Sequence, residues 1–236
     1  MKSTEITSAD WRSLYKIGGV ATLILLIYSL VTMIIMVVLG PPPETVKEMF
    51  AVLQANEFMG LLRLDLLTVI CIPLYYLLFL GFYVALRATD HAHAAVAALL
   101  GCAGVTLFLA MPSVLSLVPL SDGFANATTE IEKLRFLAAA EALLASDMWH
   151  GMGAMVGGTL VQIIMTLVSI VMLRSERFGS WTAYVGVVTH GLDLAHILMG
   201  FFFAQLEGVL MAVAGPLYLI WFPLLARDFF RLGSTV

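Results

Sequence analysis

Residues 17–39 read IGGVATLILLIYSLVTMIIMVVL, a run of 23 residues without one charged side chain. A helix of about 20 apolar residues crosses the hydrocarbon core of a bilayer. A cleavable signal peptide has an apolar core of only about 7–15 residues and a small-residue cleavage site after it. This run is longer and ends in Gly40-Pro41-Pro42-Pro43. We therefore expect a retained transmembrane helix.

The composition of the whole chain points the same way. Of its 236 residues, 61% are hydrophobic and 12% are charged, against about 45–50% and about 25% in soluble domains. The net charge of −4 gives no basis for binding nucleic acid. Cys71 and Cys102 both lie in apolar runs, where packing is the expected role of cysteine. The expected partner is the lipid bilayer.

Six apolar runs of about 18 or more residues predict six transmembrane helices. The runs are Ile17–Leu39, Leu64–Leu86, Ala94–Leu117, Met148–Leu173, Trp181–Phe203 and Gly208–Ala226. The fold class predicted is therefore all-α, a polytopic membrane helix bundle that forms a single transmembrane domain over residues 1–236.

Two long connections between these runs have the apolar spacing of amphipathic helices. We expect both, Pro41–Arg63 and Ser121–Ala145, to lie on the outer surface. Thr128, Thr129 or Asp122 is suited to cap the second helix. The expected apolar faces are Val46, Met49, Phe50 and Leu53 in the first, and Ile131, Leu134, Leu137 and Ala138 in the second.

Lysine and arginine predict the orientation of the chain. With both termini inside, the inner segments carry eight of these residues and the outer segments carry four. Cytoplasmic segments of membrane proteins carry the excess of positive charge. We expect a multi-pass protein of the bacterial inner membrane with both termini in the cytoplasm.

The fifth run contains three titratable residues, in the stretch THGLDLAH at residues 189–196. A charge at the centre of a transmembrane helix costs about 2.5–3.5 kcal/mol on insertion scales, and such residues are functional candidates. Residues three apart share a helix face, so His190 should meet Asp193, and Asp193 should meet His196. Asp147 should meet His150 in the same way.

Depth in the bilayer suggests which of these residues meet. Asp65 and Asp147 begin spans that enter from the outside, and at 1.5 Å per residue His196 lies about 10 Å below the outer boundary. The sequence predicts an outer-leaflet cluster that binds or passes a small polar species or ion. Its members are Asp65, Asp147, His150, Asp193 and His196.

Three other interpretations stay open from the sequence alone. Zinc takes His and Asp ligands, so His150, His190, Asp193 and His196 are metal candidates, and the chain would then be a membrane-embedded lipid hydrolase. A haem b needs two histidines from neighbouring helices, for which His150 and His196 are the natural pair. The third is a polar network that only holds helices together.

Several stretches together resemble a known family. They are residues 14–21 (LYKIGGVA), 73–87 (PLYYLLFLGFYVALR), 171–186 (VMLRSERFGSWTAYVG) and 226–233 (ARDFFRLG). With the Pro-Pro-Pro loop and Asp65-Leu-Leu, the chain resembles a large family of bacterial six-helix membrane proteins that is known only as a domain of unknown function. The resemblance implies one six-helix bundle in the inner membrane and implies no activity. His150 matches the family pattern, whereas the His190, Asp193 and His196 ladder does not.

Overall fold

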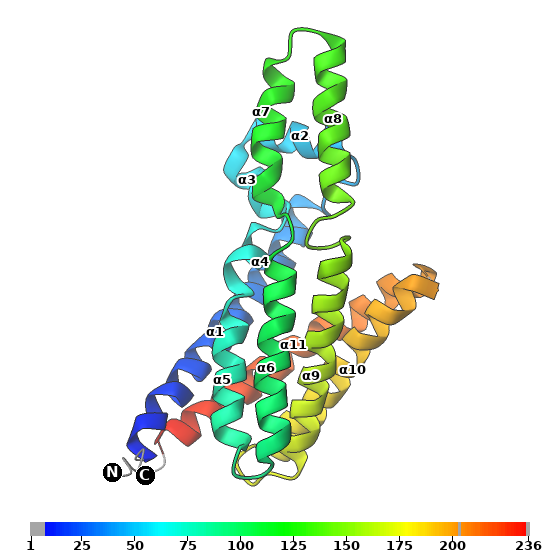
Figure 1. The fold of residues 1–236 in the computed structure, drawn as a ribbon. Coiled ribbons are helices and arrows are strands. Elements are labelled where there is room, and N and C mark those ends of the chain that lie inside the picture. The colour runs from blue at the N-terminus through cyan, green and yellow to red at the C-terminus, as the bar shows by residue number, and fades with distance from the viewer. Residues whose placement is uncertain (1–7, 203, 235–236) are drawn as a thin grey trace, which may run out of the picture. The chain divides into compact units, whose positions relative to one another are not determined.

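The computed structural model describes residues 8–202 and 204–234, and within these ranges every regular element is a helix (Figure 1). The elements are α1 Ser8–Leu39, α2 Val46–Ala55, α3 Glu57–Arg63, α4 Leu66–Cys71, α5 Leu74–Leu86, α6 His91–Leu109, the 3-10 helix η1 Val114–Ser116, α7 Leu117–Asn126, α8 Glu130–Leu144, α9 Met152–Leu173, α10 Ser180–Phe202 and α11 Ala204–Ser234. The all-α class predicted from the sequence is confirmed.

Five helical stretches of the described chain are long and apolar enough to cross a membrane. They are Trp11–Leu39, Leu66–Leu86, His91–Asn126, Met152–Leu173 and Ala212–Ser234. The predicted sixth span, Trp181–Phe203, coincides with α10 but is not among them. His190, Asp193 and His196 lower the hydropathy of α10, and Phe203 lies outside the described residues. A multi-pass membrane protein is therefore supported, while the count of six spans stays a prediction.

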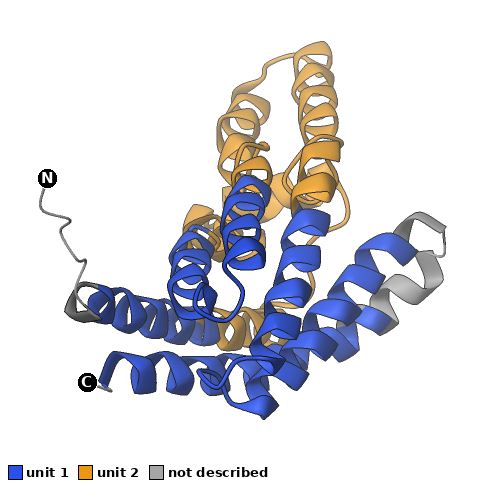
Figure 2. Cartoon of the chain, turned by 60° about the horizontal axis from the view of Figure 1, so that its bottom comes forward, with its two compact units in different colours: residues 1–27, 73–105, 158–236 blue, residues 28–72, 106–157 orange. Residues whose placement is uncertain are grey.

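The chain forms two compact units, each built from separate segments (Figure 2). Unit 1 comprises residues 1–27, 73–105 and 158–236, and unit 2 comprises residues 28–72 and 106–157. Three helices, α1, α6 and α9, run from one unit into the other. The single domain expected from the sequence stays a prediction.

Unit 2 buries an apolar core between α2, α3, α7 and α8, and Figure 1 shows α7 and α8 side by side. The predicted apolar face of α2 is confirmed, because Val46, Phe50 and Leu53 are all buried. The two predicted connections correspond to α2 and α3, and to α8 with the second half of α7, and these four helices pack on one another. This packing buries apolar surface that a single helix would leave exposed. Their position on the outer membrane surface stays a prediction.

The predicted face of α8 is wrong in part. Leu137 is buried, but Ile131 is 66% exposed and Leu134 is 62% exposed. Ala138 is also exposed, and the helix packs through Leu137, which was predicted, and Ala140, which was not. The predicted cap is confirmed at Thr129, whose hydroxyl accepts a hydrogen bond from the Glu132 amide at 3.2 Å. Thr45 caps α2 in the same way, with Glu48 as its partner.

Unit 1 has a core of large side chains. Phe82, Phe178 and Phe229 form one aromatic cluster, with ring centroids 5.4 to 6.2 Å apart. Trp221 of α11 is completely buried, and its indole N–H donates to the Thr182 carbonyl of α10 at 3.1 Å. This bond fixes the registry of α11 against α10 and so positions the polar groups that both helices carry.

Candidate functional site

A network of polar side chains joins α9, α10 and α11 inside unit 1. The Gln162 side-chain amide of α9 lies between two residues of α10. Its Nε2 donates to Asp193 Oδ2 at 3.0 Å, and its Oε1 lies 2.8 Å from His190 Nδ1. The Tyr218 hydroxyl of α11 also donates to Asp193 Oδ2, at 2.5 Å. Three helices therefore meet at one carboxylate oxygen.

The network fixes the tautomer of His190. An ionised carboxylate only accepts hydrogen bonds, so the amide NH₂ of Gln162 must face Asp193. The amide oxygen of Gln162 then faces His190, and Nδ1 of a neutral imidazole must carry the hydrogen that this oxygen accepts. Nε2 of His190 is consequently left with a lone pair.

That lone pair has no hydrogen-bond partner. His190 is completely buried, and its Nε2 makes no hydrogen bond with any residue that the structure describes. An unsatisfied buried polar atom costs about 1–3 kcal/mol. The imidazole packs edge-to-face with Trp221, at 4.6 Å between ring centroids, and with Tyr218, at 5.5 Å. The network is therefore complete at Asp193 and Gln162 and incomplete at His190.

A glycine permits this packing. A Cβ atom on Gly186, one turn before His190 in α10, would lie 2.7 Å from Trp221 Nε1 and would also meet the Ser169 hydroxyl of α9. Only a glycine lets α9 and α11 approach α10 so closely at this level. Gly191, in the next turn, has nothing within 4 Å of such an atom.

The predicted ladder along α10 forms differently from its expected geometry. His190 and Asp193 are linked through Gln162 and Tyr218. His196 interacts electrostatically with Asp193. Sequence reasoning missed Gln162 and Tyr218, although Gln162 is the only carboxamide residue in the predicted span Met148–Leu173. A lone amide in an apolar run was the available signal.

The predicted pair Asp147 and His150 is confirmed and lies in unit 2, in the turn before α9. Asp147 is 7% exposed. Its Oδ1 accepts from the backbone amides of Trp149 and His150, both at 2.8 Å, and lies 2.9 Å from His150 Nδ1. The His150 side chain itself is 66% exposed. Asp147 thus orders the turn and orients an exposed imidazole.

Asp65 also lies in unit 2, in the turn between α3 and α4 and directly before the candidate span Leu66–Leu86. Its backbone is left-handed, with φ of 72°. Its Oδ2 accepts from the Thr68 hydroxyl at 2.6 Å, and Thr68 is 2.6 Å from the Tyr28 hydroxyl. Burial raises the pKa of Asp65 to about 6, against a lowering by the Thr68 bond.

The predicted outer-leaflet cluster divides between the two units. Asp65, Asp147 and His150 belong to unit 2, and Asp193 and His196 belong to unit 1. Their convergence into one site stays a prediction. The set that the structure does bring together is Gln162, His190, Asp193 and Tyr218.

The predicted zinc site is not assembled. Across residues 8–202 and 204–234, no three His, Cys, Asp or Glu side chains form a group that could hold a metal ion. The physical reason is that several of the candidate ligand atoms already have other partners, and that His150 belongs to unit 2 whereas His190, Asp193 and His196 belong to unit 1. Gln162 faces His190 Nδ1, Asp147 faces His150 Nδ1, and Tyr218 and Gln162 both donate to Asp193.

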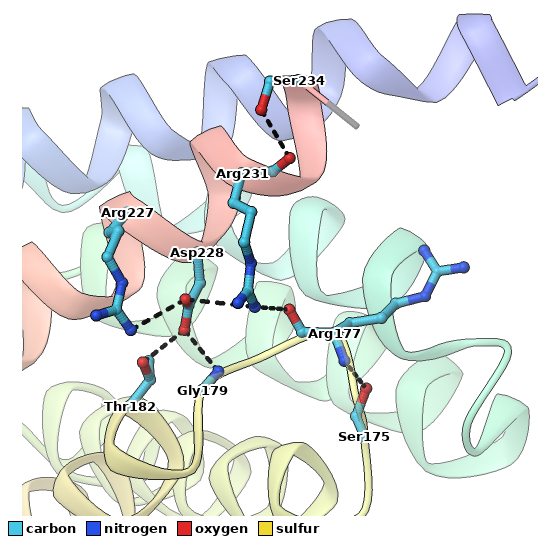
Figure 3. A network of polar contacts seen from close by, with 8 residues as sticks. All are labelled: Ser175, Arg177, Gly179, Thr182, Arg227, Asp228, Arg231 and Ser234. Carbon is cyan, nitrogen blue, oxygen red and sulfur yellow. Dashed lines mark hydrogen bonds and ion pairs between the residues drawn. The ribbon is translucent and has the colours of Figure 1, made fainter. Parts of the chain in front are cut away.

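Unit 1 contains a second carboxylate in a polar network, Asp228 of α11, and this one is completely buried (Figure 3). Its Oδ2 accepts from the Gly179 amide at 2.8 Å and from the Thr182 hydroxyl at 2.5 Å, so it caps the N-terminus of α10. Its Oδ1 lies 3.2 Å from Arg227 and 3.5 Å from Arg231. Every oxygen of Asp228 is therefore satisfied.

The helices and their apolar composition define a multi-pass α-helical membrane protein. No family model matches the chain, and neither a curated protein nor a solved structure matches it. The resemblance to bacterial six-helix membrane proteins stays a prediction.

Proposed function

We propose that this protein binds protons and passes them within the membrane through the network of His190, Gln162, Tyr218 and Asp193. The small polar species or ion expected from the sequence is then a proton. The observation that carries the proposal is the lone pair on His190 Nε2, which is buried without a partner. Chains of Asp and His inside helix bundles are typical proton relays.

The proton path follows from the hydrogen bonds. A proton that binds His190 Nε2 makes the ring cationic, and Nδ1 then gives up its own proton. The Tyr218 hydroxyl lies 3.4 Å from Nδ1, and it takes that proton while it passes its own to Asp193 Oδ2. One proton has moved from Nε2 to the carboxylate, and His190 is left in its other tautomer.

The aromatic rings stabilise the intermediate charge. Ring faces attract cations within about 6 Å, and Trp221 and Tyr218 both pack on His190 within this range. Gln162 holds His190 in the resting tautomer between transfers. Within the network both donors to Asp193, Gln162 and Tyr218, are neutral, and His196 is a further electrostatic partner of the carboxylate.

We place the protein in a bacterial inner membrane with both termini in the cytoplasm, on the excess of Lys and Arg in the inner segments. Trp11 and Arg87 fit a position at a membrane–water boundary, where tryptophan is enriched on either side of the bilayer. The guanidinium carbon of Arg87 lies 4.3 Å from the Trp11 ring centroid.

Proton flux in proteoliposomes tests the proposal. A potassium gradient with valinomycin drives protons inward, and an internal pH-sensitive dye reports them. We expect uptake with the wild type, loss of uptake with His190→Gln, and wild-type uptake with the matched control His91→Gln, which changes an exposed histidine. Wild-type uptake no faster than that of empty liposomes overturns the proposal. So does full uptake by a His190→Gln protein that melts at a lower temperature, because the network is then purely structural.

A further inference from the structure

A groove opens between α1 and α5 on the surface of unit 1, and it is separate from the polar network. Its volume is about 240 Å³. Its lining is apolar apart from the stem of one lysine. The residues are Lys16, Ile17, Val20, Ala21 and Ile24 of α1, and Leu74 and Leu77 of α5.

One end of the groove carries positive charge. The ammonium group of Lys16 makes no hydrogen bond or ion pair with the part of the chain that the structure describes, and the side chain is exposed. Arg12 precedes Lys16 by four residues, so it occupies the same face of α1 one turn away. No acidic residue lines the groove. Its charged end is thus suited to an anion.

The same end has the features of a membrane boundary. Trp11 stacks against Arg87 at 4.3 Å, one to two turns before the groove begins on α1. From Ile17 to Ile24 the groove follows α1 for about 10 Å, at 1.5 Å per residue. It therefore leads from the head-group region into the hydrocarbon region.

We infer that this groove holds one acyl chain of an anionic phospholipid whose phosphate binds Lys16. A cation at the boundary and an apolar channel beneath it match the two parts of such a lipid. A basic residue near an anionic membrane surface is worth about 1 kcal/mol. This corresponds to a roughly five-fold preference over a zwitterionic lipid. The inference does not depend on proton transfer.

Native mass spectrometry of the purified chain tests this, with equal amounts of phosphatidylglycerol and phosphatidylcholine added in detergent. We expect one phosphatidylglycerol per chain, retained roughly five-fold over phosphatidylcholine. Lys16→Gln should abolish that preference, and the matched control Lys47→Gln, an exposed lysine of unit 2, should keep it.

A second variant tests the groove itself. Val20 is 49% exposed at the groove, so Val20→Phe fills it without disturbing the core. We expect this variant to retain neither lipid. Equal retention of both lipids by the wild type, or unchanged preference in Lys16→Gln, overturns the inference. A dimer that Val20→Phe dissociates assigns the groove to a second copy of the chain and also overturns it.

Discussion

Asp193 and Asp228 are two carboxylates in the same unit, on neighbouring helices, and they differ in what surrounds them. Asp228 is fully buried, caps α10 and faces two arginines (Figure 3). Asp193 is partly buried, accepts from the neutral groups of Gln162 and Tyr218, and interacts electrostatically with His196. Asp228 ties the N-terminus of α10 to two arginines, whereas Asp193 belongs to the network for which we propose proton transfer. The comparison therefore separates an acid with a structural role from one with a proposed functional role.

Substitution of asparagine for aspartate at positions 228 and 193 should give the largest difference in thermal stability. Asp228→Asn removes the charge that faces Arg227 and Arg231 and weakens the cap of α10. Each hydrogen bond to a charged group contributes about 1.5–3 kcal/mol, and Asp228 accepts two such bonds, from Gly179 and Thr182. Asp193→Asn keeps an acceptor for the Tyr218 hydroxyl and removes no helix cap. We expect a large loss of thermal stability in detergent for the first and little or none for the second.

The two variants should also separate in proton flux. Asp193→Asn should fold normally and lose uptake in proteoliposomes, because the relay has no terminal acceptor. An equal loss of melting temperature in both variants would mean that the two acids play the same structural role, and the comparison would fail.

Asp65 is a third carboxylate with a neutral donor, and it extends the comparison to unit 2. Burial raises the pKa of Asp65 to about 6, so its ionised form destabilises the folded protein. Below about pH 4 the group is protonated in both states and there is no cost. The cost grows as the pH rises from about 4, where the unfolded state ionises, and it is complete above about 6, where the folded state ionises as well. A rise of about two in pKa corresponds to roughly 3 kcal/mol.

Asp65→Asn should therefore stabilise the protein at pH 8 and leave it unchanged at pH 4. Denaturant unfolding in detergent at both pH values measures the difference. The control is Asp122→Asn, a change in α7 outside this network. Stabilisation by the same amount at pH 4 and pH 8 would show that ionisation of Asp65 is not the cause.

Two glycines of α10 test how the site is held. A Cβ at Gly186 would collide with Trp221 and Ser169, whereas one at Gly191 would meet nothing within 4 Å. Overpacking costs about 1–3 kcal/mol, and alanine gains up to about 1 kcal/mol over glycine in a helix. Gly186→Ala should melt lower and slow proton uptake. Gly191→Ala should melt at or above the wild-type temperature and keep uptake, and a reversal of this order would exclude the packing described for Trp221.

The sequence predicted what depends on local spacing. Val46, Phe50 and Leu53 fall at helical intervals and are buried, and Thr129 precedes a helix with Glu132 at the third position and caps it. Asp147 meets His150 because three residues make one turn. Such features need no knowledge of the neighbouring helices.

The rest depends on tertiary partners that spacing does not specify. Gln162 and Tyr218 reach α10 from positions 28 and 25 residues away from His190 and Asp193 respectively. Asp228 was not predicted as a site residue, because its partners Gly179 and Thr182 come from a loop and helix 46 to 49 residues earlier. The packed face of α8 was predicted wrongly for the same reason. Its apolar residues occupy more than one face of the helix, and their spacing does not determine which face packs against other helices.

Among the carboxylates compared, substitution of Glu132 should have the smallest effect on stability. Glu132 is exposed to solvent and caps a helix. Hydrogen bonds from the Thr129 and Thr128 backbone amides, and more weakly from their hydroxyls, lower the pKa of Glu132. Because the folded pKa lies below the unfolded one, the cap stabilises α8 above the unfolded pKa and is lost as the pH falls through the folded one. Glu132→Gln should speed hydrogen exchange of the Thr128 and Thr129 amides, which donate to the carboxylate, at neutral pH. The control Glu130→Gln removes an exposed ion pair with Lys133 and no backbone bond, so it should leave those amides protected. Equal exchange in the two variants would mean that Thr129 alone caps the helix.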